Sequence, residues 1–401
     1  MHIAWEYPPL VYGGLGRHVH ALTVAQVAAG HEVMVITQEH PDAPINSTVD
    51  GVRVVREAPK PSDPFEPRYL IEWVTHLDDA LAESAAGHVK RFAPQVVHCH
   101  DWMTTRSGLS AAAAAGVPAI ATIHATERGR HQGYLPGSIS ETVDDTERFL
   151  AQHADRLIAC SRSMRREIVR QFEVPEGKVS VIPNGVDTAT WQSTGPARED
   201  ARRRWSRHGP LLVFSGRLEA EKGIFTLLDA MPHILAAHPR ARLVVSGQGG
   251  QSGRFDQVTA ERGLSDAVVR AGWQPEADLR ALIAASDIAI VPSLYEPFGL
   301  VALEAMALGA PVICARTGGL ADIVTDGETG LLFSPGDSGD LARAVLAALA
   351  DPAAARQRAH LATASLQVRF DWRVIAHDTV DVYADAISTA ARSAAEGVVG
   401  T

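Results

Sequence analysis

Two glutamates, Glu296 and Glu304, stand eight residues apart in the sequence Ser-Leu-Tyr-Glu-Pro-Phe-Gly-Leu-Val-Ala-Leu-Glu of residues 293–304. On a helix this spacing separates two carboxylates by ~12 Å along the axis. That is the reach from a sugar ring, across a diphosphate, to a ribose. The pair therefore has the types and the spacing to hold the hydroxyl groups of two sugars. The alternative is that Glu296 caps a helix and Glu304 is a solvated helical residue.

A strand and a helix are expected to position this pair. The apolar residues 288–291 predict a buried parallel strand directly before it. Pro297 suits the first turn of a helix, residues 300–308 supply its apolar positions, and Gly309 suits its end. The N–H groups at the start of such a helix would point above the sheet and form a site for an anion.

The rest of the chain alternates short apolar runs with amphipathic stretches, which is typical of an α/β protein with doubly wound parallel sheets. A length of 401 residues predicts two domains. We expect them at residues 1–190 and 211–371, joined by a polar linker at 191–210, with a helix at 372–395 that could pack back on the first domain. Ligands bind at the carboxyl ends of such strands, so two facing domains predict one cleft between them. The expected strands are residues 3–5, 31–37, 52–55, 96–98, 119–123, 157–159, 179–182, 211–215, 242–246, 268–271, 288–291, 312–315 and 330–333.

The composition excludes several classes of protein. A formal net charge of −10 argues against nucleic acid as the main partner. Three scattered cysteines indicate neither a disulfide framework nor a zinc motif, and they fit a cytoplasmic protein. We expect no signal peptide, and no apolar run approaches the roughly 18 residues that span a bilayer. Membrane contact is therefore expected to be peripheral at most, through the basic residues 162–170.

Polar residues end two expected strands of the first domain. His98, His100 and Asp101 lie at the end of the strand 96–98, and His124 follows the strand 119–123. The His-x-His-Asp sequence has no second cluster at metal-binding spacing, so we expect it to line a cleft that meets sugar hydroxyls. A single histidine at a strand end is often structural, but the position of His124 at the same sheet edge as Asp101 favours a place in the site.

Loops with glycines and cations follow the first strand of each domain. Gly13, Gly14, Leu15 and Gly16 precede the first helix, where glycines let the backbone approach a phosphate or sugar, although a tight turn would also explain them. In the second domain Gly216 begins a loop that carries two cations, which would neutralise a diphosphate without a metal. These two cations are Arg217 and Lys222, and further glycines follow strands at Gly247, Gly318 and Gly319. The chain has no Asp-x-Asp pair, so we expect no metal ion.

Together these residues resemble the retaining glycosyltransferases of family 4 with the GT-B fold, including glycogen and starch synthases. The resemblance covers nearly the whole chain, and its most specific part is the Glu296…Glu304 pair joined to the Gly216-Arg217…Lys222-Gly223 loop. The sequences Gly-Gly-Leu-Gly, His-Asp-Trp and His-Ala-Thr-Glu narrow it toward actinobacterial α-1,4-glucosyltransferases. One departure is Val11, which stands where starch synthases have a lysine that contacts phosphate.

The resemblance implies a role for each of these residues. Glu296 would hold hydroxyls of the donor sugar, Glu304 would hold the ribose, and Arg217 and Lys222 would stabilise the diphosphate as it leaves. The N–H groups of Phe298, Gly299 and Leu300 would meet sugar and phosphate. His124 would contact the donor sugar, Asp101 would line the acceptor side, and Trp273 would flank the nucleobase unless it is a core residue.

The implied reaction moves glucose from ADP- or UDP-glucose to the 4-hydroxyl of an α-glucan, with retention, and without a metal or other cofactor. Two alternatives stay open. One keeps the fold but uses another acceptor, such as glucose-1-phosphate, a lipid or a small metabolite. The other is a protein that binds a nucleotide sugar without catalysis. The sequence gives no indication of the oligomeric state.

Overall fold

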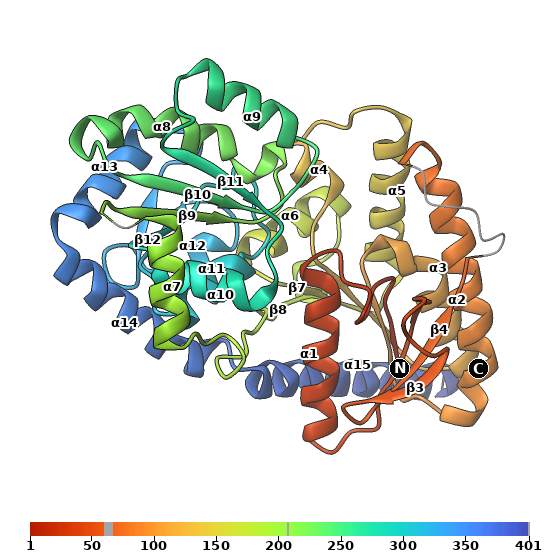
Figure 1. Ribbon diagram of the computed structural model, residues 1–401. Helices are drawn as coiled ribbons and strands as arrows, with labels where there is room; N and C mark the ends of the chain where they lie inside the picture. The colour runs from red at the N-terminus through yellow and green to blue at the C-terminus, as the bar shows by residue number, and fades with distance from the viewer. Residues whose placement is uncertain (60–66, 207, 400–401) are drawn as a thin grey trace. The chain divides into compact units, whose positions relative to one another are not determined.

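The computed structural model describes residues 1–59, 67–206 and 208–399 (Figure 1). The chain divides into two compact units, of which the first combines Met1–Gly185 with Trp372–Thr401 and the second is Val186–Asp371. Each unit has its own sheet and its own buried core. Among the described residues, no helix is both long and apolar enough to cross a bilayer.

The first unit is built on an eight-stranded sheet in the order β3-β4-β2-β1-β5-β6-β7-β8. Its strands pair in parallel, apart from β3, which runs antiparallel to β4 at the edge. The strands are β1 (His2–Ile3), β2 (Met34–Gln38), β3 (Asn46–Val49), β4 (Val52–Glu57), β5 (Val97–His100), β6 (Ala119–Ile123), β7 (Arg156–Ala159) and β8 (Val179–Val181).

Helices pack on both faces of this sheet because neighbouring residues of its strands point to opposite sides. On one face Ile36 and Val97 meet apolar residues of α2 and α3. On the other face Val35 meets α1, and Ile120 meets α1 and α15. The helices are α1 (Gly14–Ala28), α2 (Leu70–Phe92), α3 (Thr105–Ala115), α4 (Glu127–Arg130), α5 (Ser138–His153), α6 (Arg162–Phe172) and α15 (Trp372–Val399).

The second unit contains a six-stranded sheet in the order β11-β10-β9-β12-β13-β14, and every pairing in it is parallel. Its strands are β9 (Leu211–Ser215), β10 (Arg242–Ser246), β11 (Val268–Gly272), β12 (Ile288–Val291), β13 (Val312–Ala315) and β14 (Leu331–Phe333). Its helices are α7 (Gly195–Trp205), α8 (Ile224–Ala237), α9 (Ser252–Glu261), α10 (Glu276–Ala285), α11 (Leu300–Ala307), α12 (Leu320–Ile323), α13 (Ser338–Ala350) and α14 (Pro352–Arg369). Because β9 and β12 are neighbours in this sheet, the loops that follow them lie close together.

The structure differs from the sequence-based expectation between residues 191 and 210. This segment was expected to be a linker, but it contains α7 (Gly195–Trp205), and that helix belongs to the second unit. The Thr194 side chain caps the helix by accepting a hydrogen bond from the N–H of Ala197, and Pro196 occupies its first turn, where no N–H donor is needed. Arg202 then ties α7 to the sheet through Asp287, at 2.7 Å.

Candidate functional site

An ion pair links the loops that follow β9 and β12. The Nζ atom of Lys222 lies 2.9 Å from Oε2 of Glu296, and the Ser293 hydroxyl donates to the same oxygen at 3.0 Å. The Lys222 and Glu296 side chains keep only 19% and 11% of their surfaces exposed. Opposite charges so shielded from water attract each other more strongly than a surface pair does. The two residues that the sequence predicted for adjacent roles are therefore in direct contact.

We call the loop after β9 the 216–223 loop and the loop after β12 the 292–299 loop. Backbone hydrogen bonds hold these two loops together. The carbonyl of Glu221 accepts hydrogen bonds from the N–H groups of Leu294 and Tyr295, at 2.8 and 3.2 Å. Gly223 has a φ of +66°, and a Cβ atom there would lie 1.9 Å from the carbonyl oxygen of Pro292. Only glycine permits this close approach, so Gly223 brings Lys222 to Glu296.

The start of α11 offers N–H donors beside this ion pair. Gly299 caps the helix with a φ of +114°, and Leu300 is its first residue. Within the described residues, the N–H groups of Phe298, Gly299 and Leu300 donate to no other group. The first turn of a helix with unused N–H groups attracts anions.

One expectation about this helix was wrong. Glu296 and Pro297 precede α11, which begins at Leu300, so the two glutamates do not share a helix. The estimate of their separation from helical rise therefore does not apply. Glu304 is on α11 and is 5% exposed, so it is not the solvated residue of the alternative interpretation.

Arg217 is the exposed cation of the 216–223 loop. Its side chain is 56% exposed and pairs with Glu221 at 3.0 Å. Gly216 precedes Arg217 and has a φ of +151°, and Gly247 follows the neighbouring strand β10 and has a φ of +135°. A Cβ atom on Gly247 would lie 1.9 Å from the carbonyl oxygen of Gly216. Glycine at position 247 therefore allows the two loops to pack closely, and the Arg217 guanidinium beside them is exposed.

Two further glycines pack closely against the backbone of the 292–299 loop. A Cβ atom on Gly318 would lie 1.8 Å from the carbonyl oxygen of Glu296, and one on Gly319 would lie 2.4 Å from the Cα atom of Phe298. The N–H of Gly319 donates to the carbonyl of Glu296 at 2.9 Å. Gly318 and Gly319 thus position the backbone of Glu296.

The two aromatic residues predicted for this site have different surroundings. The Phe298 side chain is 4% exposed and packs edge-on against Phe370, with ring centroids 6.1 Å apart. Only its backbone can therefore serve a ligand. Trp273 follows β11 and is 69% exposed, so the alternative of a core tryptophan is wrong.

In the first unit the structure brings Asp101 and His124 together at the carboxyl ends of β5 and β6. The Oδ1 atom of Asp101 accepts a hydrogen bond from the backbone N–H of His124 at 2.6 Å. Asp101 has a φ of +60°, an uncommon conformation for a residue with a side chain. Burial raises the pKa of its carboxyl to about 6, although Arg130 acts in the opposite direction. Burial also lowers the pKa of His124 to about 3, which keeps the imidazole neutral.

The glycine loop before α1 surrounds a carboxylate of the protein itself. Glu6 accepts hydrogen bonds from the N–H groups of Tyr12 and Gly16, at 2.6 and 2.8 Å. Gly14, Leu15 and Gly16 already belong to α1, after Gly13 at its cap. The N–H groups of Tyr12 and Gly16 are therefore occupied, and sequence reasoning missed Glu6 because nothing in its local pattern marks a loop partner ten residues away.

The histidines of the His-x-His-Asp sequence are buried, although His98 borders a hollow of the first unit. His98 and His100 are 1% and 0% exposed and lie in the core of the first unit. His2 and His18, which the sequence did not single out, join them there with exposures of 3% and 5%.

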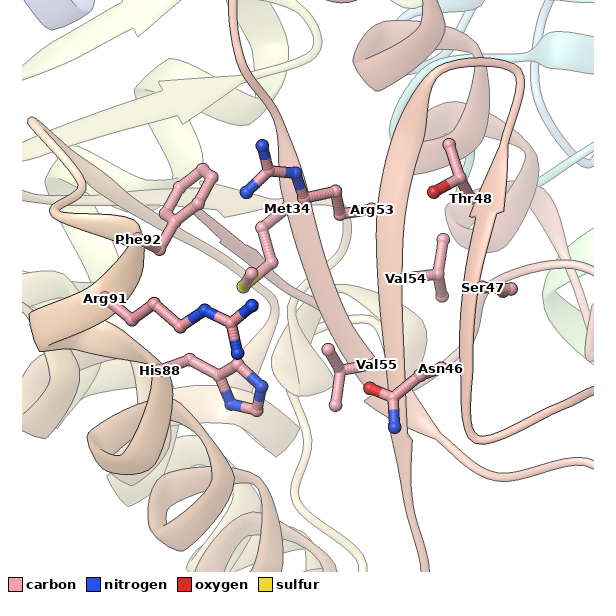
Figure 2. A pocket seen from close by; sticks show the side chains of 10 residues that line it. All are labelled: Met34, Asn46, Ser47, Thr48, Arg53, Val54, Val55, His88, Arg91 and Phe92. Atoms are coloured by element: carbon pink, nitrogen blue, oxygen red, sulfur yellow. The ribbon is translucent and has the colours of Figure 1, made fainter.

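Two hollows in the first unit are lined by described residues, and of the residues expected to line a cleft, His98 borders the second one. One of about 360 Å³ lies where Arg91 and Phe92 at the end of α2 face β3 and β4, as Figure 2 shows. The other, of about 470 Å³, is lined by residues of α1 and α15 and by the first residues of the chain. The candidate site is therefore defined by side-chain chemistry at the strand ends rather than by these hollows.

Comparisons with known proteins show the family to which the chain belongs. Residues 12–190 match the family described as Glycosyltransferase Family 4, and residues 197–365 match Glycosyl transferases group 1. The glycogen synthase of Mycobacterium tuberculosis is 39% identical over 396 residues, which cover 95% of this chain and 93% of that protein. The alpha-maltose-1-phosphate synthase of the same organism is 31% identical over 402 residues, covering 94% and 97%.

A solved structure extends the likeness to the fold. Sucrose-phosphate synthase from Thermosynechococcus elongatus superposes with a TM-score of 0.83 at 27% identity, covering 97% of this chain and 100% of that one. The predicted fold class, with two parallel-sheet α/β domains, is confirmed. The chain belongs to the family 4 glycosyltransferases and has their GT-B fold.

Proposed function

We propose that this glycosyltransferase moves glucose from a nucleotide-glucose, ADP- or UDP-glucose, to the 4-hydroxyl of an α-glucan, with retention and without a metal ion. The observation that carries the proposal is the contact of Lys222 with Glu296 at 2.9 Å beside the unused N–H groups of α11. A cation, a sugar-binding carboxylate and an anion site are thus adjacent. The name of the 39% identical relative, glycogen synthase, supports glucose and a glucan.

The diphosphate of the donor would bind at the start of α11. Lys222 has three N–H donors, so it can keep its bond to Glu296 and still donate to a phosphate oxygen. Arg217, which is exposed at 56%, adds a second cation that can reach the same anion. Cations aimed at the charge that develops on a leaving group are usually the largest contribution to such catalysis.

The donor sugar would then lie against Glu296, whose second oxygen accepts from its hydroxyls. Glu304 would hold the ribose diol, and Trp273 would stack on the nucleobase. Gly216, Gly247, Gly318 and Gly319 would act by shaping these loops. From the first unit, His124 would contact the donor sugar, and Asp101 would line the acceptor side. The backbone of residues 13–16 would approach a sugar or phosphate of the substrates.

The transfer itself needs no nucleophile from the protein. The 4-hydroxyl oxygen of the acceptor would form a bond to the anomeric carbon while the bond from that carbon to the diphosphate oxygen breaks. The hydroxyl proton would pass to the departing phosphate on the same face, which gives retention and releases a nucleoside diphosphate. Arg217 and Lys222 would stabilise the negative charge on that leaving group.

A second acceptor is favoured by one observation. The alpha-maltose-1-phosphate synthase of Mycobacterium tuberculosis is 31% identical to this chain, and its name indicates a product that carries a phosphate. The same donor site would then add a single glucose to glucose-1-phosphate. Product size separates the two reactions, because only the glucan grows through repeated additions.

The experiment is to measure nucleoside diphosphate release from ADP-glucose, UDP-glucose and GDP-mannose in EDTA. Each donor is tested alone, with maltooligosaccharides, and with glucose-1-phosphate. Release from one glucose donor that depends on maltooligosaccharides and lengthens them would support the proposal. Release that depends only on glucose-1-phosphate would support the second acceptor, and no release from any donor and acceptor pair would contradict both.

A further inference from the structure

Five histidines of the first unit lie together on one side of its sheet. His98 and His100 alternate along β5 with Val97 and Cys99, so their rings point toward the face that α1 and α15 cover. Their ring centroids are 4.2 Å apart. The cluster is completed by His2 on β1, His18 on α1 and His124 after β6.

Hydrogen bonds connect three of these rings in a row from α1 to the strand ends. Gln26 Oε1 on α1 lies 2.8 Å from His2 Nε2. His2 Nδ1 lies 3.2 Å from His100 Nε2. His100 Nδ1 lies 3.3 Å from His124 Nε2. Both ring nitrogens of His2 and of His100 are therefore used, and the row ends at the histidine that the proposed function places on the donor sugar.

The other end of the row is anchored on α15. Gln26 Nε2 donates to the Tyr383 hydroxyl at 3.2 Å. That hydroxyl lies 2.6 Å from His98 Nδ1, and His98 Nε2 lies 2.7 Å from the Thr122 hydroxyl. Burial raises the pKa of Tyr383 above its ordinary value, so its hydroxyl keeps its hydrogen and donates it to His98.

Each imidazole ring in the row carries a hydrogen on only one of its two nitrogens. Burial lowers the pKa of His2 and of His124 to about 3 and that of His100 well below 6.5, so all three are neutral near pH 7. A neutral imidazole has one donor nitrogen and one acceptor nitrogen. The orientation of one group in the row therefore sets the orientation of all the others.

We propose that Gln26, His2 and His100 form a hydrogen-bonded relay that holds His124 with its hydrogen on Nε2 and its lone pair on Nδ1. The Gln26 oxygen accepts from His2 Nε2–H, which leaves His2 Nδ1 to accept from His100 Nε2–H. His100 Nδ1 must then accept from His124 Nε2–H. Gln26, His2 and His100 are positioning residues. They make His124 Nδ1, which has no partner among the described residues, an acceptor for a hydroxyl of the donor sugar.

This inference rests on the proposed function only in giving the acceptor nitrogen a sugar to bind. The alternative is that the rings bind a metal ion, because one nitrogen from each of His18, His100 and His124 lies within 4.8 Å of the others. The structure favours the relay, because His100 and His124 direct the nitrogens that face each other into one hydrogen bond. A cation at that point would have to break this bond.

The direct test is the protonation of the His124 ring, read by nuclear magnetic resonance of ¹⁵N-histidine-labelled protein in EDTA at pH 7. The His124→Asn variant identifies the His124 signals by their loss. A protonated Nε2 and an unprotonated Nδ1 would support the relay. The reverse assignment, an equal mixture of the two forms, or a ring that takes this form only after Zn²⁺ is added would overturn it. None of these outcomes depends on turnover.

A matched pair of variants at Gln26 tests the effect on transfer. In Gln26→Glu burial keeps the carboxyl protonated, so one oxygen accepts from His2 and the hydroxyl donates to Tyr383, and the His124 signals and kcat should stay within about twofold of wild type. Gln26→Leu has similar size but no acceptor, so the His124 ring should occupy both forms and kcat should drop about tenfold with unchanged nucleoside diphosphate affinity. Equal behaviour of the folded Glu and Leu variants would overturn the relay.

The two proposals fail separately. A chain that transfers no glucose but holds His124 in the expected form contradicts the proposed function and keeps the relay. An active transferase with His124 in the reverse form contradicts the relay alone.

Discussion

Replacing Gly223 with alanine should force apart the two loops that hold Lys222 and Glu296. A Cβ atom at this position would lie 1.9 Å from the Pro292 carbonyl oxygen and 2.7 Å from its carbon. An ordinary carbon–oxygen contact is about 3.3 Å or longer, so the 292–299 loop would have to move by about 1.4 Å. The bond between Lys222 and Glu296 is 2.9 Å long and would not survive such a shift unchanged.

The loss of folding stability caused by Gly223→Ala has two parts. A φ of +66° costs a residue with a Cβ atom about 1–2 kcal/mol. Relieving the overlap with backbone atoms adds about 1–3 kcal/mol, as overpacking does in a dense core. We therefore expect Gly223→Ala to lower the free energy of unfolding by about 2–5 kcal/mol.

Gly309 supplies a matched control in the same unit. It has nearly the same backbone conformation, with a φ of +71°, but a Cβ atom there would meet nothing within 4 Å. Gly309→Ala therefore measures the conformational cost alone, about 1–2 kcal/mol. It should leave transfer activity intact, whereas Gly223→Ala should reduce it because Glu296 is displaced.

The assay is thermal unfolding followed by circular dichroism, together with the rate of nucleoside diphosphate release. For a unit of this size 1 kcal/mol corresponds to about 2–4 °C in Tm. We expect a decrease of about 5 °C for Gly309→Ala and about 10 °C for Gly223→Ala. Equal decreases, with equal activity, would refute the argument that Gly223 serves the close approach of the two loops.

Three further predictions concern single side chains. Burial raises the pKa of Asp101 from 3.8 to about 6, so the folded state binds its proton more tightly than the unfolded state does. The stability of wild type relative to Asp101→Asn should therefore fall by about 2 kcal/mol between pH 4 and pH 7, out of a full difference of about 3 kcal/mol at about 1.36 kcal/mol per pKa unit, and thermal melts that give a constant difference would contradict this. Arg217→Ala removes an exposed ion pair and should cost less than about 1 kcal/mol of stability but at least about 100-fold in kcat. Arg343→Ala, which removes the exposed pair with Asp340, should change neither, and an Arg217→Ala enzyme as active as this control would exclude the proposed role. Trp273→Ala should raise the Kd for the nucleoside diphosphate about tenfold without a change in Tm, because one stacked base contributes about 1–3 kcal/mol. Titration calorimetry that finds the same Kd for both proteins would exclude stacking.

The buried strands could be predicted from sequence because each is a short apolar run between polar turns. Residues 119–123 and 211–215 form β6 and β9 with the expected bounds. The edge strand Asn46–Val49 was missed because three of its four residues are polar and its side chains alternate between exposed and half-buried positions. Helix α7 was missed because Gly195 and Pro196 suggest a linker, although they suit a helix that begins after Thr194.

The candidate site was predictable in part. Lys222 and Glu296 were assigned to loops at strand ends, and the pairing of β9 with β12 brings these loops together. The start of α11 at Leu300 was not predictable, because the position of Gly299 at its cap depends on tertiary packing against Leu320. The histidine relay could not be predicted either, since His2 and His100, which share a hydrogen bond in it, are 98 residues apart in the chain.

The most direct test of the central claim is the turnover of Lys222→Ala. The claim is that the Lys222 ammonium, held 2.9 Å from Glu296, stabilises the leaving diphosphate during transfer. The measurement compares kcat for nucleoside diphosphate release in EDTA, with donor and maltooligosaccharide saturating, between this variant and wild type. We predict a kcat at least about 100-fold lower in a folded variant. A folded Lys222→Ala enzyme with a kcat within about threefold of wild type would contradict the account.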